Sequence, residues 1–316
     1  PAPEAPTSAP AALQAVRLGD VKPPSFDELS ALPLYQHAVE LDPNFAMAYA
    51  RLGTVYNNLG QSELAEKNRE KAFELRDRAS EHEKLYIMSH YYVDSGQLEK
   101  GITALELYKQ TYPRDSTPYN NLSVVYIMMG QYENALDNAR KAVQLDPDSA
   151  SGYSNVAFAY AGLNRLDEAK ATLNQALQHK AGAAVVHSSL ATIAWLQGDP
   201  AGVERELDLM KNDPQSEFTE TGMRSAMAAY TGQLEAARTF GQKQREAAQR
   251  LGFKEAVAGE YSQEAFMEAT FSDKTRAIAD VAQALKLSES PNVVLNCAAA
   301  LALVGENARA AKLADD

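Results

Sequence analysis

The sequence predicts an all-α protein, built as an α-solenoid of about eight to nine antiparallel helix pairs. Two observations carry this prediction. Turn residues recur at a fixed step of 34 residues from Gly96 to Gly232, and a period of this length is typical of stacked helix pairs. Between the turns, apolar residues return at the spacing of one helix face. A single pair buries too little apolar surface to be stable alone, so neighbouring pairs are expected to share a core.

Residues 1–10 are rich in Pro and Ala and predict a semi-extended linker. Residues 11–45 predict a degenerate first helix pair, interrupted by a loop that contains Pro23 and Pro24. At the other end, Ala308–Asp316 lacks a Gly stop and a polar outer face. We therefore expect the chain to be a segment of a longer polypeptide, with an uncapped last helix that can self-associate.

Residues 46–181 predict a regular array of helix pairs. The first helix of its first unit carries packing residues at i, i+3, i+4 and i+7, which places them on one helix face. These residues are Tyr49, Leu52, Gly53 and Tyr56. A second helix, marked by Ala65 and Ala72, is expected to pack against the first as an αα-hairpin.

The turns are predicted to be left-handed helix stops, a conformation that glycine and, less readily, asparagine adopt. The turn residues are Gly60, Gly96, Gly130, Asn164, Gly198, Gly232 and Gly305. Successive pairs are separated at Pro43, Pro113 and Pro147, because proline lacks an N–H and disfavours helix at the preceding residue. The residues placed to cap the next helices are Asn44, Ser116 and Ser149.

The pattern weakens in the second half of the chain. Residues 182–250 predict divergent helix pairs, because residues such as His187 replace the aromatic side chains of the packing face. Residues 251–316 predict further pairs, which regain the phase at Ala277 after an insertion near Leu251 and end as a truncated unit. A specialised function is therefore expected in this irregular half.

The packing residues of the best unit are Tyr119, Leu122, Ser123, Tyr126, Ala135 and Ala142. A shift of 34 residues maps them onto Tyr153, Val156, Ala157, Tyr160, Ala169 and Ala176. This pattern resembles the tetratricopeptide repeat family, and the resemblance covers most of the chain. It implies a superhelix whose first helices line a concave surface that binds a protein or a peptide.

A narrower resemblance rests on Ala31–Ala50, Tyr112–Ser116 and Asn164–Lys170. These segments resemble the C-terminal repeat region of large bacterial serine/threonine protein kinases of the acidobacterial type. The resemblance implies a non-catalytic scaffold that serves as the sensory or regulatory region of a signalling kinase. The segment has no Gly-rich phosphate loop and no HRD or DFG motif, so a kinase activity would belong to another part of the parent polypeptide.

Charge and hydropathy limit the partners. The 316-residue chain carries 30 Lys and Arg against 42 Asp and Glu, a formal net charge of −12, which disfavours nucleic acid and anionic membranes as partners. No run approaches the roughly 18 apolar residues of a membrane span, so we expect a soluble segment without direct membrane insertion. The resemblance places it outside the cytoplasm if a kinase tethers it, and in the cytoplasm otherwise.

No catalytic, cofactor or metal motif is present in the sequence, so we expect no enzyme activity from this segment and no cofactor. The histidines are scattered, and His82, between two glutamates, is expected at a solvated helix start rather than in a metal site. Cys297 replaces a core leucine and is expected to be buried rather than nucleophilic. With a single cysteine, no disulfide can form within the chain.

The resemblance implies that the concave surface is lined by first-helix residues outside the packing face. These residues are Arg51, Thr54, Asn58, Tyr86, His90, Asn120, Asn121, Val124, Ser154, Asn155, Phe158, Ser189, Thr192 and Trp195. Asn121 and Asn155, again 34 residues apart, offer donors and an acceptor to an extended peptide backbone; the alternative is a solvated polar face. Positions where some family members clamp a carboxylate with Lys or Arg hold Thr117, Asn121, Ser151 and Asn155. An internal or uncharged peptide is therefore favoured.

Two other functions stay open. The segment could be the ligand-sensing arm of a transcription regulator, or an adaptor for assembly or for chaperones. Flanking sequence separates these hypotheses: a kinase domain and a membrane span, a winged-helix domain, or a lipoprotein signal would each favour one of them.

Overall fold

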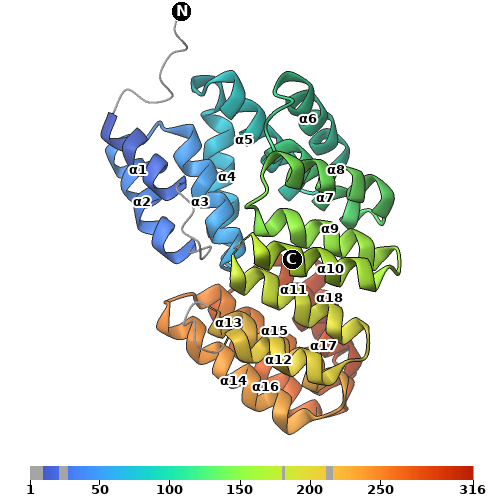
Figure 1. Cartoon of the computed structure of the whole chain (residues 1–316). Helices are drawn as coiled ribbons and strands as arrows, with labels where there is room; N and C mark the ends of the chain where they lie inside the picture. The colour runs from blue at the N-terminus through green and yellow to red at the C-terminus, as the bar shows by residue number, and fades with distance from the viewer. Residues whose placement is uncertain (1–9, 21–27, 180–181, 211–215, 316) are drawn as a thin grey trace, which may run out of the picture. The chain divides into compact units, whose positions relative to one another are not determined.

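The computed structural model describes residues 10–20, 28–179, 182–210 and 216–315. These residues form 18 α-helices packed in adjacent pairs and one 3-10 turn, η1 (Arg76–Arg78), with no strand among them (Figure 1). The predicted all-α solenoid of helix pairs is confirmed. The predicted linker, apart from Pro10, and the loop with Pro23 and Pro24 lie outside the described residues.

The first twelve helices are α1 (Pro10–Asp20), α2 (Glu28–Leu41), α3 (Ala46–Asn58), α4 (Ser62–Glu74), α5 (Glu81–Asp94), α6 (Leu98–Thr111), α7 (Thr117–Met128), α8 (Tyr132–Leu145), α9 (Ala150–Gly162), α10 (Leu166–Gln178), α11 (Ala183–Leu196) and α12 (Pro200–Met210). The last six are α13 (Glu217–Tyr230), α14 (Leu234–Arg250), α15 (Lys254–Thr270), α16 (Lys274–Leu287), α17 (Pro291–Leu303) and α18 (Asn307–Asp315).

Contacts divide the chain into two compact units. One comprises Pro1–Val55 and Lys67–Asp213, and the other comprises Tyr56–Glu66 and Pro214–Asp316. The finer division expected from the sequence, into regular, divergent and C-terminal pairs, stays a prediction.

The seven predicted turn residues all adopt a positive φ, from 57° at Asn164 to 83° at Gly305, so the predicted helix stops are confirmed. At one of them, the Gly130 N–H donates to the Ile127 carbonyl at 3.0 Å and the Gln131 N–H donates to the Tyr126 carbonyl at 2.8 Å. These two bonds form a Schellman motif. A Cβ atom on Gly130 would meet no atom within 4 Å, so the backbone angle, and not lack of space, favours glycine here.

Two further left-handed turns occur in the irregular half, at Gly252 (φ 75°) and Ser272 (φ 66°). The helices α14 and α15 contain 17 residues each, whereas α5 and α6 contain 14. Each of the two is therefore about one helical turn longer. This added length moves Ser272 to 40 residues after Gly232, and it explains the loss of phase seen near Leu251.

The helix caps follow the sequence in part. The N-cap prediction is confirmed at Ser149, whose hydroxyl accepts the Gly152 N–H at 3.2 Å. At Ser116 it is wrong, because that side chain makes no capping bond. The carboxylate of Asp115 accepts the Thr117 N–H at 2.8 Å instead, so the acidic neighbour does the capping.

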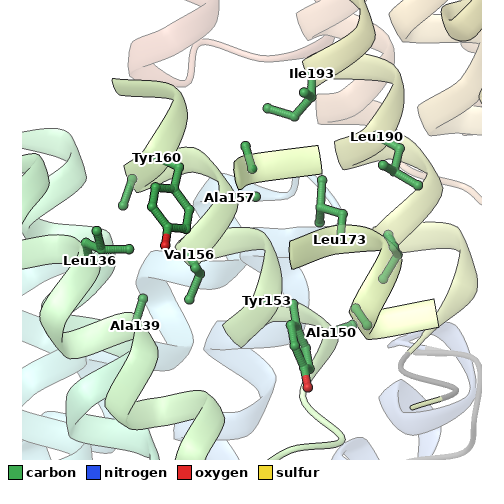
Figure 2. Close-up of a cluster of buried hydrophobic side chains, with 14 of the residues drawn as sticks. Leu136, Ala139, Ala150, Tyr153, Val156, Ala157, Tyr160, Leu173, Leu190 and Ile193 are labelled. Atoms are coloured by element: carbon green, nitrogen blue, oxygen red, sulfur yellow. The ribbon is translucent and has the colours of Figure 1, made fainter. Parts of the chain in front are cut away.

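In the first unit, a core cluster around α9 lies at the predicted packing positions. Figure 2 shows Tyr153, Val156 and Tyr160 of α9 between Leu136 of α8 and Leu173 of α10. All five are buried, and several of the packed positions are alanine, which lets neighbouring helices approach closely. The other packing tyrosines, at positions 49, 56, 119 and 126, are half-buried.

The second unit has its own core, in which α15, α16 and α17 pack through alanine and valine. Cys297 is fully buried there, beside Ala300 and Leu301, so its predicted burial is confirmed. Burial raises the pKa of the Cys297 thiol to about 11, which keeps it in the unreactive protonated form at neutral pH.

Candidate functional site

The predicted site residues of α3 and α5 contact one another. The Thr54 hydroxyl lies 3.3 Å from the Tyr86 hydroxyl, and the Tyr86 ring stacks on His90 with centroids 3.9 Å apart. The Arg51 guanidinium lies 4.8 Å from the Tyr86 ring centroid and forms an ion pair with Asp20 at 2.8 Å. The start of the site is thus a packed aromatic and cationic cluster.

Side-chain amides extend this cluster across α7. The Asn121 Nδ2 lies 3.2 Å from the His90 Nε2, and the Asn155 Nδ2 donates to the Asn120 Oδ1 at 2.9 Å. The Asn120 Nδ2 lies 3.5 Å from the Asn121 Oδ1. Hydrogen bonds therefore join α5, α7 and α9. We call Thr54, Tyr86, His90, Asn120, Asn121 and Asn155 the polar row.

The hydrogen bonds of His90 fix the direction of the polar row. Its Nδ1 lies 2.9 Å from the Tyr86 carbonyl oxygen, which can only accept, so Nδ1 carries the proton. The Nε2 atom of the neutral ring then accepts from the Asn121 amide. Burial lowers the pKa of His90, although the Asp94 charge opposes this. With a neutral ring the amides donate in one direction, from Asn155 to Asn120, from Asn120 to Asn121 and from Asn121 to His90.

The row leaves part of each amide free. Asn121 and Asn155 each use one N–H in the row, and the Asn155 oxygen accepts no hydrogen bond from the described residues. Each NH2 group has two donors. A donor on each helix and one acceptor on α9 therefore remain for a partner.

On α9 and α11 two predicted site residues satisfy each other instead. The hydroxyls of Ser154 and Ser189 lie 2.9 Å apart, and the side chains are 5% and 3% exposed. Tyr86 is 5% exposed as well. These three residues hold the helices together. Because they are buried, a partner would contact the more exposed residues beside them.

The other predicted residues lie closer to solvent. Asn58 and Val124 are exposed, while Phe158, Thr192 and Trp195 are half-buried. Five residues of the predicted set lie six positions before their turns and so occupy equivalent places on five first helices. These residues are Thr54, His90, Val124, Phe158 and Thr192.

A second set of equivalent residues lies two positions before each turn, and the sequence prediction missed all but one of them. Its members are all exposed: Asn58, Asp94, Met128, Gly162 and Leu196. Only Asn58 was predicted, yet the same turn spacing would have found the others. Met128 and Leu196 are 64% and 53% exposed, so apolar surface accompanies the polar row on α7 and α11.

His82 is not simply solvated. Its Nε2 lies 2.7 Å from the Asp115 carboxylate and 3.0 Å from the Tyr108 hydroxyl, which itself donates to Asp115 at 2.6 Å. Burial alone would raise the pKa of Asp115, but the hydrogen bonds from His82 and Tyr108 hold it below its ordinary value. The cluster joins the start of α5 to α6 and to the start of α7, and it thereby fixes the spacing of two helix pairs.

The described residues contain no group of three or more His, Cys, Asp or Glu side chains arranged to hold a metal ion. Among the described helices, none is both long and apolar enough to cross a bilayer.

Tetratricopeptide repeat family models match residues 34–67 and 126–193. These two segments are therefore similar to tetratricopeptide repeats. The second match contains Asn155 and both buried serines, so part of the predicted site lies within it. Tetratricopeptide repeat proteins generally act as protein-interaction scaffolds, and their fold is typically non-catalytic. Neither match shows the narrower resemblance to kinases, which stays a prediction.

A comparison of the chain with curated proteins found no match. A comparison with solved structures found proteins that are similar to part of the chain. A thermophilic tetratricopeptide repeat protein of Thermus thermophilus is 22% identical over 52% of this chain and 88% of its own, with a TM-score of 0.45. PilF of Pseudomonas aeruginosa is 20% identical over 64% and 91%, with a TM-score of 0.40. MamA of Desulfovibrio magneticus is 18% identical over 55% and 97%, with a TM-score of 0.34.

Proposed function

We propose that the chain is a non-catalytic scaffold that binds an extended, largely uncharged segment of a partner protein along the first helices α3, α5, α7, α9 and α11. The observation that carries the proposal is the polar row, which runs through hydrogen bonds from α3 to α9 and still leaves amide groups free. Its fixed orientation reduces the entropy lost on binding.

Charge and hydropathy support this kind of partner. The row itself contains no carboxylate and no lysine, so it lacks a clamp for a charged chain end. Val124 and Met128 are exposed on α7, one and two turns after Asn121, and Leu196 is exposed on α11. These residues suit apolar side chains that alternate with backbone contacts. An internal peptide segment with mixed polar and apolar residues fits both features.

The test is selection from a random-peptide phage library on the full chain. Wild-type protein is expected to enrich a family of sequences. The double variant Asn121→Ala, Asn155→Ala should lose that enrichment, because each substitution removes the free donors and interrupts the row. The matched control is the double variant Asn134→Ala, Asn138→Ala on α8. It also removes two asparagine amides, but these donate only to residues three or four positions away on the chain.

Equal enrichment by wild type and the α7/α9 double variant would contradict the proposed surface. Loss in both double variants would point to general destabilisation and would also count against it. Circular dichroism of each variant, compared at one temperature, shows whether the helices are retained.

We propose further that this scaffold is the sensory or regulatory region of a bacterial signalling kinase. The support is the resemblance of Ala31–Ala50 and of two later segments to such kinases. The sequence of the parent gene tests this: an upstream kinase domain would agree with it, and a winged-helix domain or a lipoprotein signal would contradict it.

A further inference from the structure

A cavity of about 170 Å³ lies among α13, α14 and α15 in the second unit. Small residues on α13 and α14 leave the space unfilled; among them are Gly222, Ala226, Ala229 and Gly241. An apolar cavity of about 150 Å³ is known to hold benzene, so this one has room for a ligand of about six non-hydrogen atoms. We call it the α13–α15 cavity.

Glu260 of α15 lines the cavity and has no partner. Its side chain is 8% exposed and makes no hydrogen bond or ion pair with any residue that the structure describes. Glu264, one turn further along, is paired with Arg245, whose guanidinium lies 4.7 Å from the Tyr261 ring centroid. Arg245 thus forms its ion pair with Glu264, although its charge also attracts Glu260. A buried carboxylate without a cation is costly, so the site is suited to a positive ligand.

The other polar groups of the cavity are acceptors or can act as such. The Gln244 side chain is 7% exposed and has no hydrogen bond within the described residues. The Ser225 hydroxyl donates to the Ala237 carbonyl at 2.9 Å, which leaves its oxygen free to accept. An ammonium group has three donors and no acceptor, and three acceptors are offered here by Glu260, Gln244 and Ser225.

The remaining wall suits an alkyl chain. Met267 and the alanines of α13 and α14 are apolar and face the same space. A divalent metal ion would need about six oxygen ligands, more than this set offers. Burial, reinforced by Glu264, raises the pKa of Glu260 to about 7 although Arg245 opposes it, as expected for a carboxylate that lacks its cation.

We propose that the α13–α15 cavity binds a small alkylammonium group, with the charge held by Glu260 and the N–H groups shared among Glu260, Gln244 and Ser225. The group could belong to a free amine or to a lysine side chain, which have the same chemistry. The proposal does not depend on the polar row, which lies on other helices.

The test is a titration of the full chain, labelled with ¹³C at its methionine methyl groups, at about pH 8, where alkylamines are protonated. Met267 lines the cavity and reports on its contents; its resonance is assigned with Met267→Leu. The probes are n-butylamine, neutral n-butanol, and the capped tripeptide Gly-Lys-Gly. Butylamine is expected to shift Met267 and to bind about tenfold more tightly than butanol, the margin of a charged hydrogen bond.

The amine and the tripeptide separate the two sources. Tighter binding of butylamine assigns the site to a free amine, and tighter binding of the tripeptide assigns it to a lysine side chain. Equal affinity for butanol and butylamine, or no shift of Met267 with either amine, would overturn the proposal.

Two variants test the residues. Glu260→Gln should weaken butylamine binding about tenfold, whereas Glu246→Gln, an exposed change on α14, should not alter it. Gly241→Ala should also weaken binding, because the added Cβ atom would take up space in the cavity. This Cβ would lie 3.5 Å from the Ser225 Oγ and 3.7 Å from an Arg245 guanidinium nitrogen, so it would not clash with either. Alanine also favours the helix, so loss of binding there would not reflect unfolding. Wild-type affinity in both cavity variants would refute the assignment.

Discussion

Replacing Glu260 with glutamine should stabilise the second unit at high pH. In the folded chain burial raises the pKa of Glu260 to about 7, against an ordinary value of 4.5. Between these two values the folded state binds more protons than the unfolded state, so stability falls as pH rises. The protonated carboxyl makes its full contribution to stability below the unfolded-state pKa of 4.5, and this contribution is lost as pH rises through the folded-state pKa of about 7. This difference between the two pKa values corresponds to about 3 kcal/mol in the free energy of unfolding.

The measurement is urea denaturation of wild type and Glu260→Gln near pH 4.5 and near pH 8.5. The Met267 methyl resonance is followed, since helix arrays can unfold in parts and this probe lies beside the substitution. The variant is expected to match wild type at the lower pH and to exceed it by about 3 kcal/mol at the higher pH. Asp280, whose pKa burial also raises, contributes the same slope to both proteins and cancels in the comparison. Glu264 interacts electrostatically with Glu260, so the measured difference belongs to the pair of carboxyls.

Glu246→Gln is the control, because its exposed carboxylate should leave the pH dependence unchanged. A constant difference between wild type and Glu260→Gln at both pH values would refute the reasoning. So would a wild type that gains stability relative to the variant as pH rises.

Two further predictions concern the scaffold. Gly130→Ala should destabilise the first unit by about 1 kcal/mol, because alanine is strained at positive φ. Asn164→Gly should be neutral or slightly stabilising. Thermal denaturation measures both, and equal effects of the two substitutions would contradict the prediction. Arg238 makes two hydrogen bonds, of 2.6 and 2.7 Å, to Glu268, which is 1% exposed. Arg238→Ala should therefore cost about 3 kcal/mol in urea denaturation, because the buried carboxylate would keep only the more distant ion pair with Arg276, at 4.0 Å, among the described residues. A loss below about 1 kcal/mol would refute this pairing as the reason.

The helix turns could be predicted from the sequence because their backbone angle restricts the residue type. A positive φ favours glycine and asparagine, so the seven turn residues stood out at a constant spacing. Ser272 adopts the same conformation with φ 66°, but serine does not mark it. The longer α14 and α15 then displaced it from the 34-residue period, and nothing in the local sequence indicated this turn.

The side-chain pairings of the candidate site were harder to predict. Tyr86 lies 32 residues from Thr54, and Asn121 lies 31 residues from His90, so these contacts do not follow the repeat period. Glu260 shows the other limit. On a helix rich in acidic residues it resembles a surface charge, and only the packing of small residues on two neighbouring helices turns its surroundings into a cavity.

The central claim, that a partner lies along the first helices, is tested most directly by photo-crosslinking. p-Benzoylphenylalanine replaces Phe158 on α9, beside the polar row, or Leu107 on α6, a second helix where the side chain is 52% exposed. The probe is a peptide selected from the phage library. Crosslinking from position 158 and not from position 107 is the result that the account predicts. Crosslinking from position 107 alone would contradict it.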